Sequence, residues 1–205
     1  MKVRIAMVLA LATVLSAVIG LGILPVRAHS SDGSTETLKR ISPAPAFSLI
    51  AQDGKPFSLA DTRGKVVVLS FIFTSCPDIC PVVVYKLVGL QEELGDQFGR
   101  DVFFVTVTVD PENDTPELLK DYAGTLGCDF TGWAFLTGAP ADIQQVSRDY
   151  GVIYRKQPDG EIVHNLLTSV IDRNGILRVQ YMGERFNPNE LLNDVRMLIA
   201  EQAEQ

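Results

Sequence analysis

Residues 66–81 read VVVLSFIFTSCPDICP, an apolar run followed at once by two cysteines. Positions 66–73 are almost all β-branched, aliphatic or aromatic, which is the pattern of a strand buried on both faces of a sheet. After the cysteines, residues 82–98 place apolar side chains at the 3.6-residue period of an α-helix. The stretch therefore predicts a buried strand, a turn that carries the cysteines, and an amphipathic helix.

Cys76 and Cys80 are two of only three cysteines in 205 residues. Two thiols four positions apart can form a disulfide, bind a soft metal together, or have no joint role. Pro77 and Pro81 disfavour α geometry in the residue before each, so we expect a stiff turn with Cys80 near the helix N-cap. There the helix dipole would favour a thiolate. Such a turn can bring the Cα atoms within about 4.4–6.8 Å, so a disulfide and a two-thiolate metal site both stay open.

Strand-like and helix-like segments alternate outward from this stretch. Further strands are expected at residues 102–109 and 133–137, and helices at residues 114–126, 140–150 and 187–203. Three hairpins complete the pattern: residues 46–50 with 56–59, residues 152–155 with 161–164, and residues 167–171 with 176–182. This order implies an α/β sandwich with an extra N-terminal β-hairpin and a β-hairpin insertion.

The first 28 residues have the pattern of a membrane-targeting segment. Lys2 and Arg4 precede a charge-free run at residues 5–26, which is long enough to cross a bilayer. Residues 26–28, VRA, offer a small-residue cleavage site, so a cleaved signal peptide and a transmembrane anchor both stay open. Positive charge ahead of the run places the remaining chain outside the cytoplasm, on the periplasmic side of an inner membrane.

The remaining chain divides into a linker and one domain. Residues 29–43, HSSDGSTETLKRISP, are polar and predict a linker, which leaves residues 44–205 for a single domain. Removing residues 1–28 takes away three cations and no acid, so the formal charge falls from −7 to −10. This balance excludes nucleic acid as a partner, because phosphate binding needs clustered Lys and Arg.

His164 is the single histidine beyond the linker, and it precedes a predicted strand. A thiol–disulfide oxidoreductase usually has two residues between its cysteines, whereas this chain has three. On a thioredoxin-like order of elements such an enzyme would also have a proline where residues 163–166 read VHNL. Two thiolates and one imidazole suit Cu(I), with Zn(II) as a chemical competitor. Three protein ligands leave a coordination position open, and the alternative reading of His164 is a core histidine.

Four segments together resemble the SCO/SenC family of copper chaperones. They are FTSCPDICP at residues 73–81, VTVDPENDTPELLKDY at 107–122, FLTG at 135–138, and His164 ahead of VID at 170–172. The resemblance extends from residue 43 to the C-terminus, and the cysteine motif CPDxCP of the family is intact. An acid would be expected near the histidine, and Val163 stands there instead.

The resemblance carries specific expectations for fold, ligands and partners. It implies a thioredoxin-like fold, one membrane anchor, and a copper ion bound by Cys76, Cys80 and His164. It also implies a role in maturing the dinuclear CuA centre of cytochrome c oxidase subunit II. An upstream protein that delivers copper is a further expected partner, and the N-terminal segment is the expected contact with the membrane.

Other side chains have two readings each. Asp78, between the thiols, is a candidate for a supporting contact or transient metal ligand, or it caps the turn. Asp110, Asp114 and Glu117 form an acidic cluster, most of which is read as helix capping, with partner recognition as the alternative. Cys128 is read as a half-buried free thiol, and Met182 as a core residue rather than a thioether ligand.

Three classes of function are compatible with these residues. The leading hypothesis is a metallochaperone, which binds and transfers copper without catalytic turnover. An enzyme is the first alternative, either a thiol–disulfide reductase that keeps the oxidase cysteines reduced, through Cys76 and Cys80, or a thiol peroxidase. The second alternative is a copper or redox sensor. His164 separates the first two, because reductase chemistry would survive its loss.

Overall fold

The computed structural model describes residues 37–157 and 162–201. The predicted anchor or signal segment at residues 1–28, most of the predicted linker, and the tip of the predicted hairpin insertion lie outside these residues. Among the helices of the described residues, none is long and apolar enough to cross a bilayer.

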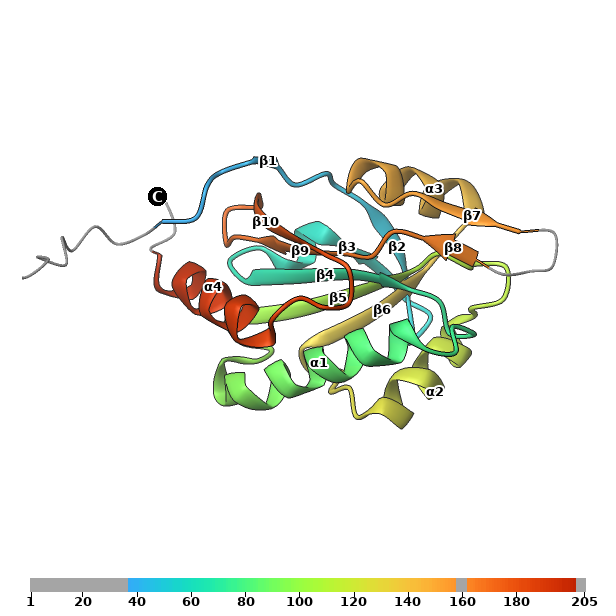
Figure 1. Ribbon diagram of the computed structural model, residues 1–205, viewed down its shortest axis with the longest axis horizontal. Coiled ribbons are helices and arrows are strands. Elements are labelled where there is room, and N and C mark those ends of the chain that lie inside the picture. The colour runs from blue at the N-terminus through green and yellow to red at the C-terminus, as the bar shows by residue number, and fades with distance from the viewer. Residues whose placement is uncertain (1–36, 158–161, 202–205) are drawn as a thin grey trace, which may run out of the picture. The chain divides into compact units, whose positions relative to one another are not determined.

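The domain is a mixed α/β fold built on one eight-stranded sheet (Figure 1). The strands are β1 Ser42–Pro43, β2 Ser48–Ala51, β3 Pro56–Ser58, β4 Val66–Ile72, β5 Val102–Thr108, β6 Trp133–Thr137, β7 Tyr154–Lys156, β8 Ile162–His164, β9 Leu167–Ile171 and β10 Ile176–Met182. The helices are α1 Ile79–Leu94, α2 Pro116–Leu126, α3 Pro140–Asp149 and α4 Pro188–Ala200, with short 3-10 helices η1 Leu59–Thr62 and η2 Gly95–Gln97. The sheet order is β1-β10-β9-β4-β5-β6-β2-β3, and β7 and β8 form a separate two-stranded sheet.

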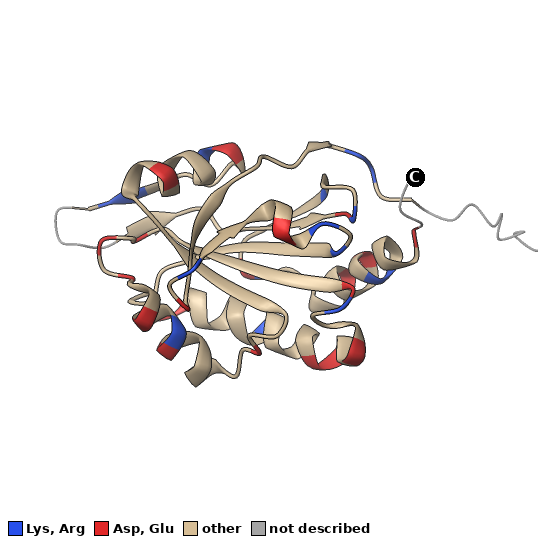
Figure 2. Cartoon of the chain, turned by 180° about the vertical axis from the view of Figure 1, so that it is seen from behind, with Lys and Arg blue, Asp and Glu red and all other residues tan. Residues whose placement is uncertain are grey.

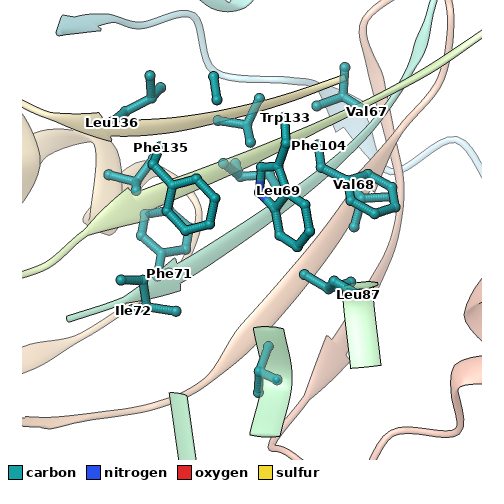
Figure 3. Packing of buried hydrophobic residues seen from close by; sticks show 14 of the residues in the cluster. Val67, Val68, Leu69, Phe71, Ile72, Leu87, Phe104, Trp133, Phe135 and Leu136 are labelled. Carbon is teal, nitrogen blue, oxygen red and sulfur yellow. The ribbon is translucent and has the colours of Figure 1, made fainter. Parts of the chain in front are cut away.

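The centre of the sheet is parallel and buried. Strand β4 pairs in parallel with β5, which pairs in parallel with β6, and every residue of β4 is buried. None of these three strands contains a charged residue, and Figure 2 shows the charged residues on the helices and loops around them. Aromatic rings fill the core beside them, where Trp133 lies 5.1 Å from Phe104 and 5.3 Å from Phe135 between ring centroids (Figure 3). The domain therefore has an apolar, rigid centre.

Helices cover both faces of this sheet. Helices α1, α2 and α4 lie on one face and α3 lies on the other (Figure 1), as expected when successive parallel strands are joined by helices that cross in the same direction. Helix α2 begins with Pro116 after the N-cap Thr115, whose hydroxyl accepts the N–H of Leu118, and it ends at Gly127 with φ 86°. A left-handed residue of this kind suits glycine, because no Cβ clashes with the backbone.

The predicted strands, the N-terminal hairpin and the hairpin insertion are confirmed, with boundaries that shift by a few residues. Strand β7 pairs antiparallel with β8, in a register that places Tyr154 opposite His164. Of the segment predicted as a linker, residues 42–43 form β1 and pair with Leu177 and Ile176 of β10. The final stretch of that segment therefore lies along the edge of the sheet.

The start of the first helix differs from the prediction. Helix α1 begins at Ile79, so Cys80 and Pro81 both lie in its first turn and Asp78 is the N-cap. The expectation of a non-helical turn up to Cys80 is wrong. The first backbone N–H groups of a helix have no partner within the helix, so a proline in the first turn removes no hydrogen bond.

Candidate metal centre

Three elements bring the predicted ligands to one end of the sheet. Cys76 lies in the loop that follows β4, Cys80 in the first turn of α1, and His164 at the end of β8. Cys76 and His164 both line a pocket of about 550 Å³, together with Phe73 and Asp78. The pocket lies where the carboxyl end of a central parallel strand meets the start of a helix, a common place for binding sites in α/β sheets.

The two cysteines are adjacent and reduced. The backbone N–H of Cys80 donates to the Sγ atom of Cys76 over 3.4 Å, and both side chains are free thiols. Cys76 is half-buried and Cys80 is fully buried. A reagent or partner that enters from the pocket therefore meets Cys76 first, and Cys80 stands behind it.

Cys80 is not the activated thiolate that its place at a helix start suggested. Burial raises the pKa of the Cys80 thiol far above its usual value, and the neighbouring Cys76 raises it further. Desolvation of the charged form thus outweighs the favourable helix dipole in the metal-free protein. A metal ion that binds here must displace a proton, because only the thiolate is a good ligand.

His164 has a half-buried imidazole that favours the neutral form. Its Nδ1 atom lies 3.1 Å from the backbone oxygen of Asn165, and its ring packs edge-on against Phe73 with centroids 5.7 Å apart. A carbonyl oxygen only accepts hydrogen bonds, so Nδ1 carries the proton and Nε2 keeps its lone pair. Burial lowers the pKa of the imidazole, which keeps it neutral. The acid that the resemblance led us to expect near Val163 is replaced in this contact by a backbone carbonyl.

The three predicted ligands are not gathered around one point in the structure. Across residues 37–157 and 162–201, no group of three or more His, Cys, Asp or Glu side chains is close enough to hold a metal ion. Cys76 lines the pocket from the loop after β4, with Cys80 buried behind it at the start of α1, and His164 comes from the separate two-stranded sheet.

Asp78 stands at the rim of this pocket. It is the N-cap residue of α1, yet its carboxylate makes no capping hydrogen bond within the described part of the chain. The side chain is exposed and lines the same pocket as Cys76 and His164. The capping interpretation is therefore wrong, and the carboxylate is placed to face whatever enters the pocket.

Asp114 has a different role from the one predicted. Helix α2 is capped by Thr115, not by Asp114. The buried carboxylate of Asp114 instead accepts the backbone N–H of Thr74 over 3.1 Å, and also the hydroxyls of Thr74 and Thr108. Thr74 lies two residues before Cys76, so this acid holds the start of the cysteine loop. The sequence contained no signal for this contact beyond the presence of an acid after a buried strand.

Tyr122 and Cys128 lie behind the cysteine pair. The hydroxyl of Tyr122 is buried without a hydrogen-bond partner among the described residues. Burial raises the pKa of Tyr122, and the proximity of Cys80 and Cys76 raises it further. Cys128 is buried more deeply than predicted, and burial raises the pKa of its thiol to about 12. Met182, expected in the core, is 76% exposed at the end of β10.

Comparisons with known proteins identify relatives over most of the chain. A family model described as SCO1/SenC matches residues 35–200, a range that includes Cys76, Cys80 and His164. The SCO1 protein homolog of Bacillus subtilis (strain 168) is 32% identical over 154 residues, which cover 73% of this chain and 79% of that protein.

Solved structures share the fold. Arabidopsis thaliana ScoI with copper bound aligns with a TM-score of 0.69 and 30% identity, over 78% of this chain and 100% of the solved chain. BsSco, described as a member of the Sco family of cytochrome c oxidase assembly proteins with a disulfide switch, aligns with a TM-score of 0.71 and 29% identity. That alignment covers 82% of this chain and 100% of the solved chain.

Proposed function

The chain belongs to the SCO1/SenC family, and on this basis and from the site described above we propose that it is an extracytoplasmic copper metallochaperone. Copper is its cargo, held by Cys76, Cys80 and His164. The observation that carries the proposal is the pairing of Cys76 and His164 in the lining of one pocket, with the free thiol of Cys80 buried directly behind Cys76.

The chemistry of these donors fits Cu(I). Thiolate sulfur and imidazole nitrogen are the soft and borderline ligands that Cu(I) prefers, whereas a site for Mg²⁺ or Ca²⁺ would need several oxygens. The hydrogen bond from Nδ1 of His164 to the backbone of Asn165 fixes the orientation of the ring and raises the basicity of Nε2. Thr74, held by Asp114, supports the loop that carries Cys76. The chain's own residues therefore supply both the ligands and their orientation.

The pocket also provides a route for release. Cargo moves by ligand exchange when an acceptor's donor atoms approach the bound ion from its open side. The rim of the pocket carries the exposed apolar side chains of Ile79 and Val163, and Val82 continues this surface along α1. Exposed apolar residues beside a binding site are typical of protein contact surfaces. The acceptor would cover them while its ligands reach the bound copper through the pocket.

The proposed acceptor is the CuA site of cytochrome c oxidase subunit II. Support comes from family membership and from BsSco, which is described as an assembly protein of that oxidase. An upstream donor protein would load the site. The positive residues ahead of the charge-free run at residues 5–26 support a location on the periplasmic side of the inner membrane, with the domain anchored or exported by residues 1–28.

A reductase activity is the second candidate, and the asymmetry of the thiols favours it. Cys76 is half-buried and Cys80 is buried behind it, which is the arrangement of an attacking and a resolving thiol. In this reaction Cys76 and Cys80 would be oxidised to a disulfide, and the two electrons and two protons would convert the disulfide of an oxidase subunit into two thiols. Reduced acceptor thiols are also what copper loading requires.

One comparison tests the proposal directly. The reduced chain should bind one copper per molecule, and X-ray absorption should show sulfur in the coordination shell of the copper. Oxidation to the Cys76–Cys80 disulfide should abolish that binding.

Cells that lack the protein should lose CuA-oxidase activity at limiting copper and recover part of it with added copper. A His164→Ala variant that binds copper as tightly as wild type and fully restores the oxidase would refute the chaperone site and leave the reductase candidate.

A further inference from the structure

The two ligand-bearing elements contact a common third segment. This segment joins β5 to α2 and comprises residues 109–115, VDPENDT; we call it the anchor loop. It contains no proposed metal ligand. One of its acids contacts the loop that carries Cys76, and another contacts the hairpin that carries His164.

The first contact is made by Asp114. Its carboxylate is 1% exposed and accepts two hydrogen bonds from Thr74, one from the backbone N–H and one from the hydroxyl. It also accepts the hydroxyl of Thr108, the last residue of β5. A buried carboxylate is costly unless it is fully hydrogen-bonded, so the two bonds from Thr74 and the third from Thr108 hold Asp114 firmly in place. The tie joins positions 40 apart in the sequence.

The second contact is made by Asp110. Its carboxylate is 4% exposed and accepts the Nζ–H of Lys156 over 3.2 Å and the amide of Asn113 over 2.7 Å. Lys156 also bonds Glu112 over 2.8 Å. Lys156 is in β7, whose residue Tyr154 pairs with His164 in β8. The lysine therefore ties the histidine-bearing hairpin to the anchor loop.

Thr108 joins the two contacts. Its hydroxyl donates to Asp114 and accepts the backbone N–H of Asp110 over 2.9 Å. The carboxylate of Asp114 and the backbone N–H of Asp110 are therefore both bonded to one buried hydroxyl at the end of β5, which fixes each contact independently against the same atom. The cysteine loop and the hairpin are thus both held in place through contacts to the hydroxyl of Thr108, at the end of the central strand β5.

We propose that the anchor loop sets the position of His164 relative to Cys76 and Cys80, with Asp110 and Asp114 as positioning residues and Lys156 as the tie to the histidine arm. The proposal rests on the copper site proposed above. It predicts two arms that can be perturbed separately: loss of the Lys156 tie acts only through the imidazole, and loss of the Thr74 tie acts only through the thiols.

The histidine arm is tested with Lys156→Met, with Lys156→Arg as the variant that keeps the charge. Cu(I) affinity is measured by competition with a chromophoric chelator, in the wild-type background and in the His164→Ala background. We expect Lys156→Met to weaken Cu(I) binding by up to about 10-fold, the lower end of the range for residues that bond a ligand directly, because Lys156 acts on His164 only through the hairpin. Lys156→Arg keeps the charge and should stay closer to wild type than Lys156→Met. In the His164→Ala background the effect of Lys156→Met should disappear. Lys55→Met breaks the exposed ion pair with Asp53 in the N-terminal hairpin and should have no effect on Cu(I) affinity in either background.

The cysteine arm is tested with Thr74→Val, which removes one hydroxyl and leaves the backbone bond to Asp114. We expect it to weaken Cu(I) binding equally in both backgrounds, because it acts through Cys76. An effect of Lys156→Met that is equal in both backgrounds, or absent in the wild-type background, would overturn the proposal. So would a Thr74→Val effect that vanished without His164.

Failure of the copper site can be told apart from failure of the anchor. If the wild-type chain bound no Cu(I), the proposed function would fall, and the anchor would be judged on the metal-free protein by amide hydrogen exchange. Faster exchange in Ile162–His164 of the Lys156→Met variant, with unchanged exchange in β4, would support the anchor. Unchanged exchange in both elements would overturn it.

Discussion

The two ends of strands β9 and β10 use buried polar groups in opposite ways. At one end, Arg178 is buried and its guanidinium bonds Asp172 over 2.9 Å, Glu201 over 2.6 Å and the backbone oxygen of Lys39 over 3.1 Å. At the other end, beyond the start of β9, the Nδ1 atom of His164 bonds the backbone oxygen of Asn165, which leaves the lone pair on Nε2. Cys76 lines the same pocket of about 550 Å³ as His164, and Cys80 is buried behind Cys76.

The difference separates groups that stabilise the fold from groups that we propose to bind copper. A buried charge is tolerated only when its hydrogen bonds are satisfied within the protein, and the pairing of Arg178 meets that condition. Thiols and a neutral imidazole carry no charge, so burying their sulfur and nitrogen atoms costs less free energy than burying an ion. We therefore expect changes at the arginine end to alter stability and changes at the cysteine end to alter binding.

The largest expected effect is the loss of copper in Cys76→Ser. An alcohol oxygen is a poor ligand for Cu(I), so one of two soft donors disappears. The variant should stay folded, because the half-buried Cys76 contributes only a long hydrogen bond from the N–H of Cys80. Copper per chain after gel filtration of the reduced protein measures the effect. Retention of one copper at wild-type affinity would contradict the assignment.

The next effect concerns the arginine end. Arg178→Met leaves Asp172 buried without its cation, so we expect the free energy of unfolding to fall by about 3–5 kcal/mol. Copper affinity should stay unchanged. Chemical denaturation measures the first quantity and chelator competition the second. Arg196→Met, an exposed arginine that bonds the backbone oxygen of Glu93, is the matched control and should change stability by no more than about 0.5 kcal/mol.

His164→Ala should weaken Cu(I) binding by more than about 100-fold, beyond the range for residues that only orient a ligand. The Cys76–Cys80 disulfide should still form, because both thiols and the start of α1 remain. Titration against a competing chelator gives the affinity, and Val163→Ala, which changes the exposed neighbouring side chain, serves as the control. A fall of less than tenfold would show that the imidazole is not a ligand.

A smaller effect is expected from pH. Burial lowers the pKa of His164 in the folded state, so below its ordinary value of about 6.5 the unfolded chain binds the proton more readily. Stability from this group is present above pH 6.5 and is lost as the pH falls. The wild type should therefore lose more stability than His164→Ala between pH 7.5 and 5.5, as measured by urea unfolding. An equal loss in both proteins would show that the ring is not desolvated.

The smallest effect is expected at Cys128. Burial raises the pKa of this thiol to about 12, so at pH 8 it is almost entirely protonated and shielded. Iodoacetamide should modify Cys76 in the native protein and leave Cys128 intact, as mass spectrometry of the digested chain would show. Cys128→Ser should change Cu(I) affinity by less than about twofold. Rapid native modification of Cys128 would indicate that the region opens.

Local patterns were enough to predict the elements that carry the site. Seven consecutive buried positions in β4 have the continuous apolar pattern of a central strand, and the period of the following segment indicated helix α1. The sequence predicted that α1 starts after Cys80, whereas it starts at Ile79. Proline disrupts the interior of a helix but fits the first turn, so Pro81 alone did not fix the helix start. Met182 was misread as a core residue from its apolar type alone, and at the end of β10 it is 76% exposed.

The sequence by itself identified Cys76, Cys80 and His164 as candidate ligands, since their residue types, scarcity and spacing are properties of the chain. Only the tertiary structure showed how they are held. Asp114 reaches Thr74 across 40 positions and Lys156 reaches Asp110 across 46. An acid after a strand can cap the next helix or bond a distant segment. Both arrangements give the carboxylate its hydrogen bonds, so the local sequence does not distinguish them. The choice depends on which groups the folded sheet brings within hydrogen-bond distance, and that information is not local in the sequence.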